Sequence, residues 1–162
     1  MKKITRYKFD KMYEKSLETG EPLELPNCYF FDLYLEKRNL VNANFEGSVF
    51  EKVNLDKANL NGVNMKGAKI KESTFISADL TEANLTGTKI RNVSFVKANL
   101  NDAILIGSNL IRASFHLCKL VNTDFENVNM KETFIRGAKM ENTNFNNVIT
   151  EDCGIDSNIN QL

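Results

Sequence analysis

Between Cys28 and Asn147 the sequence repeats every five residues, and this period leaves few folds open to the chain. The third residue of each unit is Leu, Phe, Met or Ile at every fifth position from Phe30 to Phe145, which makes 24 such positions in succession. A period of five matches neither the 3.6-residue turn of an α-helix nor the two-residue alternation of a β-strand. A short strand followed by a corner does have this period, so the sequence predicts a chain that turns after every unit.

Each unit also has a preferred residue type at its first two positions. The residue two before the large apolar one is small or β-branched, as at Ala43, Ser48 and Val53, and the residue between them is usually Asn or Asp. Alternate residues of a strand point to opposite faces. The small and the large residue are therefore predicted to point inward, and the Asn or Asp between them outward.

A second period, of 20 residues, sets the number of corners in one coil. Leu60 and Leu80 belong to a column of similar core residues at this spacing, and Asn127 and Asn147 extend a column of glycines at the last position of the unit. Gly and Asn tolerate the positive φ that the third residue of a type II turn requires. Four units per coil predict an all-β solenoid, a quadrilateral parallel β-helix of about six coils in which Leu60 and Leu80 stack. The glycines of this column are Gly47, Gly67, Gly87 and Gly107.

Other corners carry charged residues instead of glycine. Such residues disfavour positive φ, so a different turn type is predicted on those sides. These residues are Asp32, Lys37, Lys52, Lys57, Glu72 and Lys97.

The two ends of the chain depart from the repeat. Residues 1–25 are predicted to cap the first coil, with a helix over about 6–18 that ends before Gly20 and Pro22. Residues 26–147 form the repeat region, and 148–162 are expected to be an irregular coil with a frayed tail. The apolar residues at helical spacing that would cover the first coil are Tyr7, Phe9, Met12, Tyr13 and Leu17.

The units ANLNG, ADLTE, ANLTG and ANLND resemble the consensus A(D/N)LXX of the pentapeptide-repeat family. The resemblance covers about three quarters of the chain and implies a right-handed quadrilateral β-helix. Some family members dimerise through the C-terminal end, so the resemblance implies a possible homodimer of that kind here. It also implies a possible relation to the quinolone-resistance members, which occupy the DNA site of gyrase through a strongly acidic surface.

Composition restricts the kind of partner. Lys plus Arg equals Asp plus Glu at 21 each, so the formal net charge is zero and no overall field favours nucleic acid or a membrane surface. The N-terminal segment has lysines but no apolar stretch of a secretory signal behind them. A cytoplasmic protein without a membrane-spanning segment is expected.

Residues with catalytic or metal-binding chemistry are few. Cys28, Cys118 and Cys153 all occupy the small inward position and are predicted to be reduced, buried thiols. His116, the single histidine, is predicted to lie at an exposed corner without an oriented partner. No zinc spacing or phosphate-binding loop is present, so the sequence predicts neither an enzyme nor a cofactor.

Two outer surfaces are candidates for binding. One is an apolar partner surface, and the other is an anion-binding patch whose alternative is an ordinary solvated face. The sequence predicts a non-enzymatic scaffold for an unknown protein partner. The alternative is a gyrase- or topoisomerase-binding protein, which the zero net charge disfavours, and direct nucleic-acid binding is disfavoured further. The apolar surface comprises Ile76, Val96, Leu117 and Phe134, and the basic patch comprises Lys69, Lys71, Lys89 and Arg91.

Overall fold

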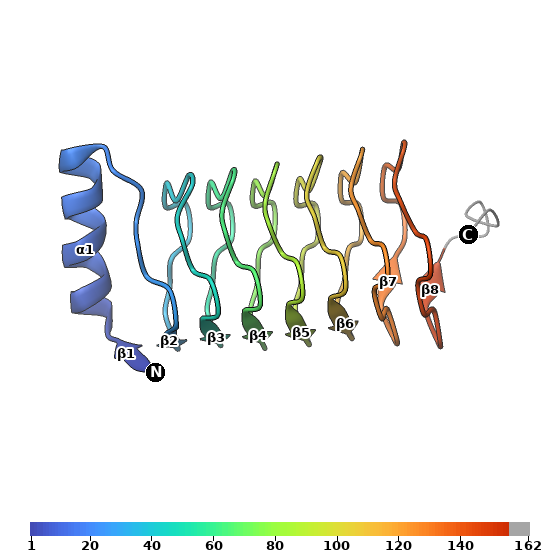
Figure 1. Cartoon of the computed structure of the whole chain (residues 1–162), viewed down its shortest axis with the longest axis horizontal. Coiled ribbons are helices and arrows are strands. Elements are labelled where there is room, and N and C mark those ends of the chain that lie inside the picture. Colours follow the sequence, from blue (N-terminus) through green and yellow to red (C-terminus); the bar gives the residue numbers. More distant parts are fainter. Residues whose placement is uncertain (156–162) are drawn as a thin grey trace.

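The chain folds as a parallel β-solenoid (Figure 1). Large apolar side chains stack in four columns along its axis. The computed structural model describes residues 1–155. The predicted frayed tail, SNINQL, lies outside the described residues. Asn59 pairs in parallel with Asp79, which places Leu60 and Leu80 on neighbouring rungs, and both side chains are fully buried. The predicted four-sided solenoid with a short N-terminal helix is confirmed.

The first side of the solenoid is a six-stranded parallel sheet in the order β1-β2-β3-β4-β5-β6. From β2 to β6 each strand pairs with the next one twenty residues on, as Phe50 does with Ile70. A two-stranded sheet on the second side pairs β7 with β8. The strands are β1 (Lys2–Ile4), β2 (Cys28–Phe31), β3 (Val49–Glu51), β4 (Lys69–Lys71), β5 (Lys89–Arg91), β6 (Asn109–Ile111), β7 (Phe134–Ile135) and β8 (Gly154–Ile155).

The number of coils differs slightly from the predicted six and depends on the side. Within residues 1–155, the ladder on the third side runs in 20-residue steps from Asn39 to Lys139, whereas the second side runs from Tyr34 to Gly154 and so has one rung more. The prediction of an irregular coil after residue 147 is wrong for the described part, because Ile149 pairs with Asn129 and β8 pairs with β7. The repeat geometry therefore continues where the five-residue sequence pattern has already failed.

Outward asparagines and aspartates have a structural role that the periodicity did not reveal. The Oδ1 atom of Asn64 accepts a hydrogen bond from the backbone N–H of Lys66 at 3.1 Å, and its Nδ2 atom donates to Oδ1 of Asn44, one coil earlier, at 3.2 Å. Such side-chain bonds satisfy backbone groups at corners that no strand partner reaches. The side chain that points outward thus closes the turn and also links neighbouring coils.

Hydroxyl groups in the small inward position are also paired. The Ser48 hydroxyl donates to the carbonyl of Leu25 at 2.9 Å, and the Ser108 hydroxyl donates to the carbonyl of Leu85 at 2.7 Å. Buried polar groups are tolerated when they are hydrogen-bonded. Serine and threonine can therefore alternate with alanine in this column.

The predicted difference in backbone conformation between the corners is wrong. Every corner residue adopts positive φ, including Glu72 at 50° and Lys97 at 60°. From Asn27 to Glu132 each positive-φ corner residue donates its backbone N–H along the solenoid, as Lys57 does to the carbonyl of Ile76 at 2.9 Å and Lys97 to that of His116 at 2.9 Å. This bond, together with the 20-residue register, offsets the cost of about 1–2 kcal/mol that a side chain incurs in the left-handed region.

What does differ between the corners is the bond that closes the turn. The N–H of Ala58 bonds the carbonyl of Leu55 at 3.1 Å, whereas the N–H of Val53 bonds the Ser73 hydroxyl at 3.0 Å. The corner after Phe50 is thus closed by a side chain of the next coil.

Helix α1 (Arg6–Thr19) covers the N-terminal end of the solenoid (Figure 1). It begins after the N-cap Thr5 and ends at Gly20, whose φ of 72° lies in the left-handed region. Phe9 and Tyr13 are buried against the first coil, whereas Tyr7 and Leu17 are 73% and 55% exposed, so the prediction that all five apolar residues face the coil is wrong. Strand β1, which the sequence pattern did not reveal, precedes the helix and extends the sheet by one strand.

Ile104 interrupts the ladder of outward amides, and replacing it with Asn should stabilise the protein. Ile104 stands between Asn84 and Asp124 and is 41% exposed. An Asn at this position can accept from the N–H of Ile106 and donate to Asn84, as Asn64 and Asn144 do at the equivalent positions two coils away on either side. We expect Ile104→Asn to raise the free energy of unfolding by about 1 kcal/mol. Chemical denaturation measures the free energy of unfolding, and Ile104→Leu is the control, because leucine has no hydrogen-bond acceptor. If the Asn variant were less stable than the wild type, the outward amides would not have this stabilising role.

Candidate interaction surfaces

The predicted apolar surface lies on the second side of the solenoid and at the corner that follows it. Ile76 and Val96 occupy one corner position on neighbouring coils, and both are half-buried. Leu117 is 44% exposed and Phe134 is 50% exposed. The structure therefore separates the four predicted residues into an inner pair that packs on the solenoid and an outer pair that solvent reaches.

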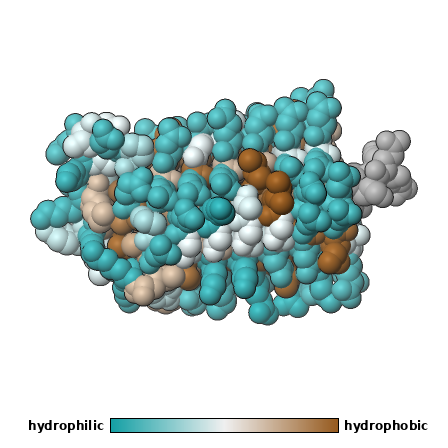
Figure 2. All heavy atoms as spheres, in the orientation of Figure 1, coloured by the Kyte–Doolittle hydropathy of each residue, from teal (hydrophilic) through white to brown (hydrophobic). Residues whose placement is uncertain are grey.

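Both outer residues extend over glycines one coil further on. A Cβ atom added to Gly137 would lie 2.8 Å from Cδ2 of Leu117, and one added to Gly154 would lie 2.5 Å from Cδ1 of Phe134. Strand β7, which carries Phe134, lies on the face turned to the viewer in Figure 1. In the same orientation Figure 2 shows brown areas in the C-terminal half of an otherwise mostly teal face. The apolar residues are thus held in place and still accessible.

The predicted basic patch lies on the first side, across β4 and β5. Lys69 pairs in register with Lys89, and Lys71 with Arg91, so all four predicted residues are brought together. All four are exposed. Outward residues of one strand are about 6.6 Å apart and neighbouring strands about 4.8 Å apart, so the four cations stand at the corners of a small rectangle on a flat sheet.

Carboxylates neutralise only one of these four cations within the described residues. Lys71 Nζ lies 3.2 Å from Glu72 and 3.4 Å from Glu51, and these two carboxylates raise the pKa of Lys71, Glu72 more than Glu51. The hydroxyl of Tyr29 donates to Glu51 at 2.9 Å and lowers the pKa of that carboxyl, with Lys71 adding to the effect. The other cations form no ion pair with any described residue.

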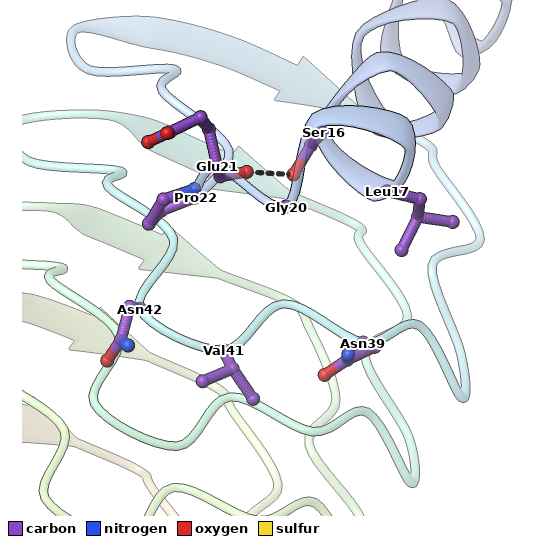
Figure 3. Close-up of a pocket in the computed structure, with 8 residues that line it drawn as sticks. All are labelled: Ser16, Leu17, Gly20, Glu21, Pro22, Asn39, Val41 and Asn42. Atoms are coloured by element: carbon purple, nitrogen blue, oxygen red, sulfur yellow. Dashed lines mark hydrogen bonds between the residues drawn. The ribbon is translucent and has the colours of Figure 1, made fainter.

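A groove of about 300 Å³ lies between the end of α1 and the start of the third side of the solenoid, including the corner that follows it (Figure 3). Leu17 and Val41 border it with apolar side chains, and Asn39 and Asn42 with amides. The Ser16 hydroxyl donates to the carbonyl of Glu21 at 2.6 Å, so it is already used in holding the loop after the helix. The lining contains no imidazole, thiol or amine, and Figure 3 shows the one carboxylate in it, that of Glu21, pointing away from the Ser16 hydroxyl. The groove can therefore hold a side chain but offers no nucleophile with its base.

The predicted thiols are free of disulfides, and two of them are buried. Cys118 donates its Sγ hydrogen to the carbonyl of Phe95 at 2.8 Å, and burial raises its pKa to about 12. A thiol with this pKa is protonated at neutral pH and is a poor nucleophile. Cys153 is only partly buried, because it lies in the last described coil, and Cys28 is buried in the first. His116 is exposed at a corner, as predicted.

Within residues 1–155 no three His, Cys, Asp or Glu side chains come together in a way that could hold a metal ion. In the same range, α1 is neither long nor apolar enough to cross a lipid bilayer.

Four exposed apolar residues of the solenoid were missed by the sequence reasoning, and two of them, Phe31 and Tyr34, are 37% and 58% exposed in the first coil. Ile104 is 41% exposed and Ile149 is 57% exposed. Ile104 stands where neighbouring coils have Asn or Asp, so comparison of equivalent positions twenty residues apart could have found it. Half-buried Ile106 and Ile111 lie in the same coil and make its outer surface more apolar than that of the coils before it.

Solved structures with significant similarity to the chain include pentapeptide repeat proteins. One is a pentapeptide repeat protein from the thylakoid lumen of Arabidopsis thaliana, with 21% identity, a TM-score of 0.36, and coverage of 57% of this chain and 68% of that one. Another is the pentapeptide repeat protein Rfr23 from the cyanobacterium Cyanothece 51142, with 19% identity and a TM-score of 0.36. The match covers 86% of this chain and 98% of that one. A third is QnrB1, a plasmid-mediated fluoroquinolone resistance protein, with 19% identity, a TM-score of 0.33, and coverage of 82% and 70%.

No curated protein matches the chain significantly. The family described as pentapeptide repeats does match, in eight copies over residues 28–67, 78–116 and 108–147. The five-residue period, the four-sided solenoid and this match agree, and the chain belongs to the pentapeptide-repeat family.

Proposed function

We propose that this protein is a non-enzymatic scaffold that binds another protein through the second side of its solenoid. Pentapeptide-repeat proteins are generally structural or scaffold proteins, and the described residues include no nucleophile with an oriented base. The observation that carries the proposal is the exposure of Phe134, at 50%, next to a corner where Leu117 is 44% exposed.

A protein partner suits this surface for two physical reasons. Aromatic and aliphatic side chains that are half-exposed on a rigid backbone bury apolar area with little loss of conformational entropy. Phe134 and Leu117 are supported from below by Gly154 and Gly137, so they are already ordered before a partner arrives. Inner residues Ile76 and Val96 extend the apolar area toward the middle of the rod.

The test is affinity capture from the native host with the wild-type chain and with the double variant Leu117→Asp, Phe134→Asp. We expect one dominant protein with the wild type and at least a tenfold loss with the double variant. Tyr34→Asp is the matched control, because Tyr34 occupies the same position as Phe134 at the other end of the ladder and is 58% exposed. Far-UV circular dichroism establishes that the variants are folded. Equal capture by wild type and double variant would refute this surface.

The alternative, a gyrase-binding protein that mimics DNA, fits the charges of the surface less well than the scaffold does. Carboxylates on the first side pair with cations, as Glu132 does with Arg112 and Glu151 with Lys131, so they do not form an acidic strip. A supercoiling assay with purified gyrase tests the alternative directly.

Association of two copies through the C-terminal end remains a proposal. Its support is that Met140, Phe145 and Val148 are only partly buried in the last coils, whereas equivalent residues further inside are fully buried. Sedimentation of the wild-type protein at high concentration tests it, and a monomer there would end the idea.

A further inference from the structure

The first side of the solenoid presents three exposed cations without an ion-pair partner in residues 1–155: Lys69, Lys89 and Arg91. They lie on β4 and β5, in the middle of the six-stranded sheet that runs along the lower edge of the view in Figure 1. Like charges on neighbouring strands repel one another, so an array without carboxylates is a cost to the folded protein. An anionic ligand would remove this cost.

Access to the array is open along one edge. Corner residues Gly67, Gly87 and Gly107 border it, and an added Cβ at any of them would have no heavy atom within 4 Å. Two other glycines are covered: an added Cβ would lie 2.5 Å from Oδ1 of Asn27 at Gly47, one coil earlier in the same column, and 2.3 Å from Oδ1 of Asn42 at Gly62, on another corner. This column of uncovered glycines lets another backbone approach the sheet closely.

The array is short and is followed by an apolar residue. Glu51, on the preceding rung, ends the positive charge on the N-terminal side and, together with Glu72 at the corner after β4, pairs with Lys71. On the C-terminal side Arg91 pairs in register with Ile111, which is half-buried. Only two rungs are therefore positive, over about 5 Å of the rod axis.

We propose that the first side binds an acidic polypeptide segment, with carboxylates on Lys69, Lys89 and Arg91 and an apolar side chain on Ile111. Alternate side chains of an extended peptide are about 6.8 Å apart, which matches the separation of Lys89 and Arg91 along β5. Arg91 can hold a carboxylate through two parallel N–H bonds, and the lysines act as point charges. This surface is separate from the second side, so the two sites can be occupied independently.

A polypeptide fits these features better than a nucleic acid does. A phosphate backbone needs a long positive track, often with aromatic residues for stacking, whereas this array ends after two rungs and adjoins an isoleucine. The formal net charge of zero also gives no long-range attraction for a polyanion. An acidic peptide with an apolar end uses both the cations and Ile111.

The test measures fluorescence anisotropy of three labelled peptides with the full chain. The first has six glutamates followed by two leucines, the second replaces the leucines with serines, and the third replaces the glutamates with glutamines. We expect the first to bind at least tenfold more tightly than the third and about threefold more tightly than the second. Affinity for the first peptide should fall as the salt concentration rises.

Variants assign the binding to this surface. The double variant Lys89→Glu, Arg91→Glu is expected to lose at least tenfold in affinity, and Ile111→Ser to lose the preference for leucines. Lys57→Glu, Lys97→Glu is the matched control, because it makes the same change in net charge at exposed corners of another side and should lose less than twofold. A twenty-nucleotide oligothymidylate serves as the nucleic-acid probe. Tighter binding of this probe than of the first peptide, an equal loss in both double variants, or no peptide binding would each overturn the proposal.

Discussion

Replacing Phe95 with alanine is expected to lower the free energy of unfolding by about 3–5 kcal/mol. Phe95 is fully buried, and its ring stacks between those of Phe75 and Phe115 with both centroids at 4.9 Å and interplanar angles of 20° and 6°. Truncation leaves a cavity between two rings that the backbone holds in register. Each coil contacts only its neighbours, so the loss at one coil cannot be spread over a wider core.

The midpoint of urea denaturation, followed by circular dichroism, measures this effect. Phe31→Ala is the control, since Phe31 is 37% exposed on the first side and contacts Lys3 and Lys52 through its ring face at 5.8 Å each. We expect this control to lose about 1 kcal/mol or less. If Phe95→Ala cost no more than Phe31→Ala, the column of stacked rings would not be what holds neighbouring coils together.

The path of the backbone was predictable because each apolar position repeats in strict register. Phe95 and Phe115 are twenty residues apart in the sequence, and this spacing alone places one ring over the other. The conformation of the corners was not predictable in the same way. Lys97 would avoid positive φ as an isolated residue, and only the ladder bond to the next coil, at 2.9 Å, makes the left-handed conformation acceptable. At these corners the 20-residue register of the solenoid overrides the local preference of the residue for negative φ.

The ends and the outer surfaces were less predictable for a related reason. The sequence spacing that identified α1 gave the same weight to Tyr7 as to Phe9, although only Phe9 is buried, because a helical period does not say how the helix is rotated on the coil. The basic array was predictable from the register that aligns Lys69 with Lys89. Which of its cations form no ion pair was not predictable, because the pairing of Lys71 with Glu72 depends on how long side chains fold back at a corner.

Replacing Phe9 with aspartate is expected to detach the N-terminal cap from the solenoid. The Phe9 ring is fully buried and packs edge-on against Phe30 at 6.5 Å and parallel to Tyr13 at 5.9 Å. A carboxylate there would have no partner in an apolar site, so the helix would leave rather than bury the charge. Tyr13 would lose its position as well. Its hydroxyl accepts from the N–H of Asn39 at 3.0 Å, and the Arg38 guanidinium lies 4.8 Å from its ring.

Loss of the cap should leave the remaining coils folded but should expose their first strand. Strand β2 would then present unpaired backbone groups, because β1, whose Lys2 and Lys3 are exposed, pairs with β2 just before the helix begins. Open strand edges pair with other chains. We expect faster hydrogen exchange at Cys28–Phe31 and concentration-dependent self-association in sedimentation, with β circular dichroism largely retained. Tyr7→Asp, on the exposed face of the same helix, should behave as the wild type. A Phe9→Asp protein with protected β2 and wild-type sedimentation would mean that the solenoid does not depend on α1 to close its N-terminal end.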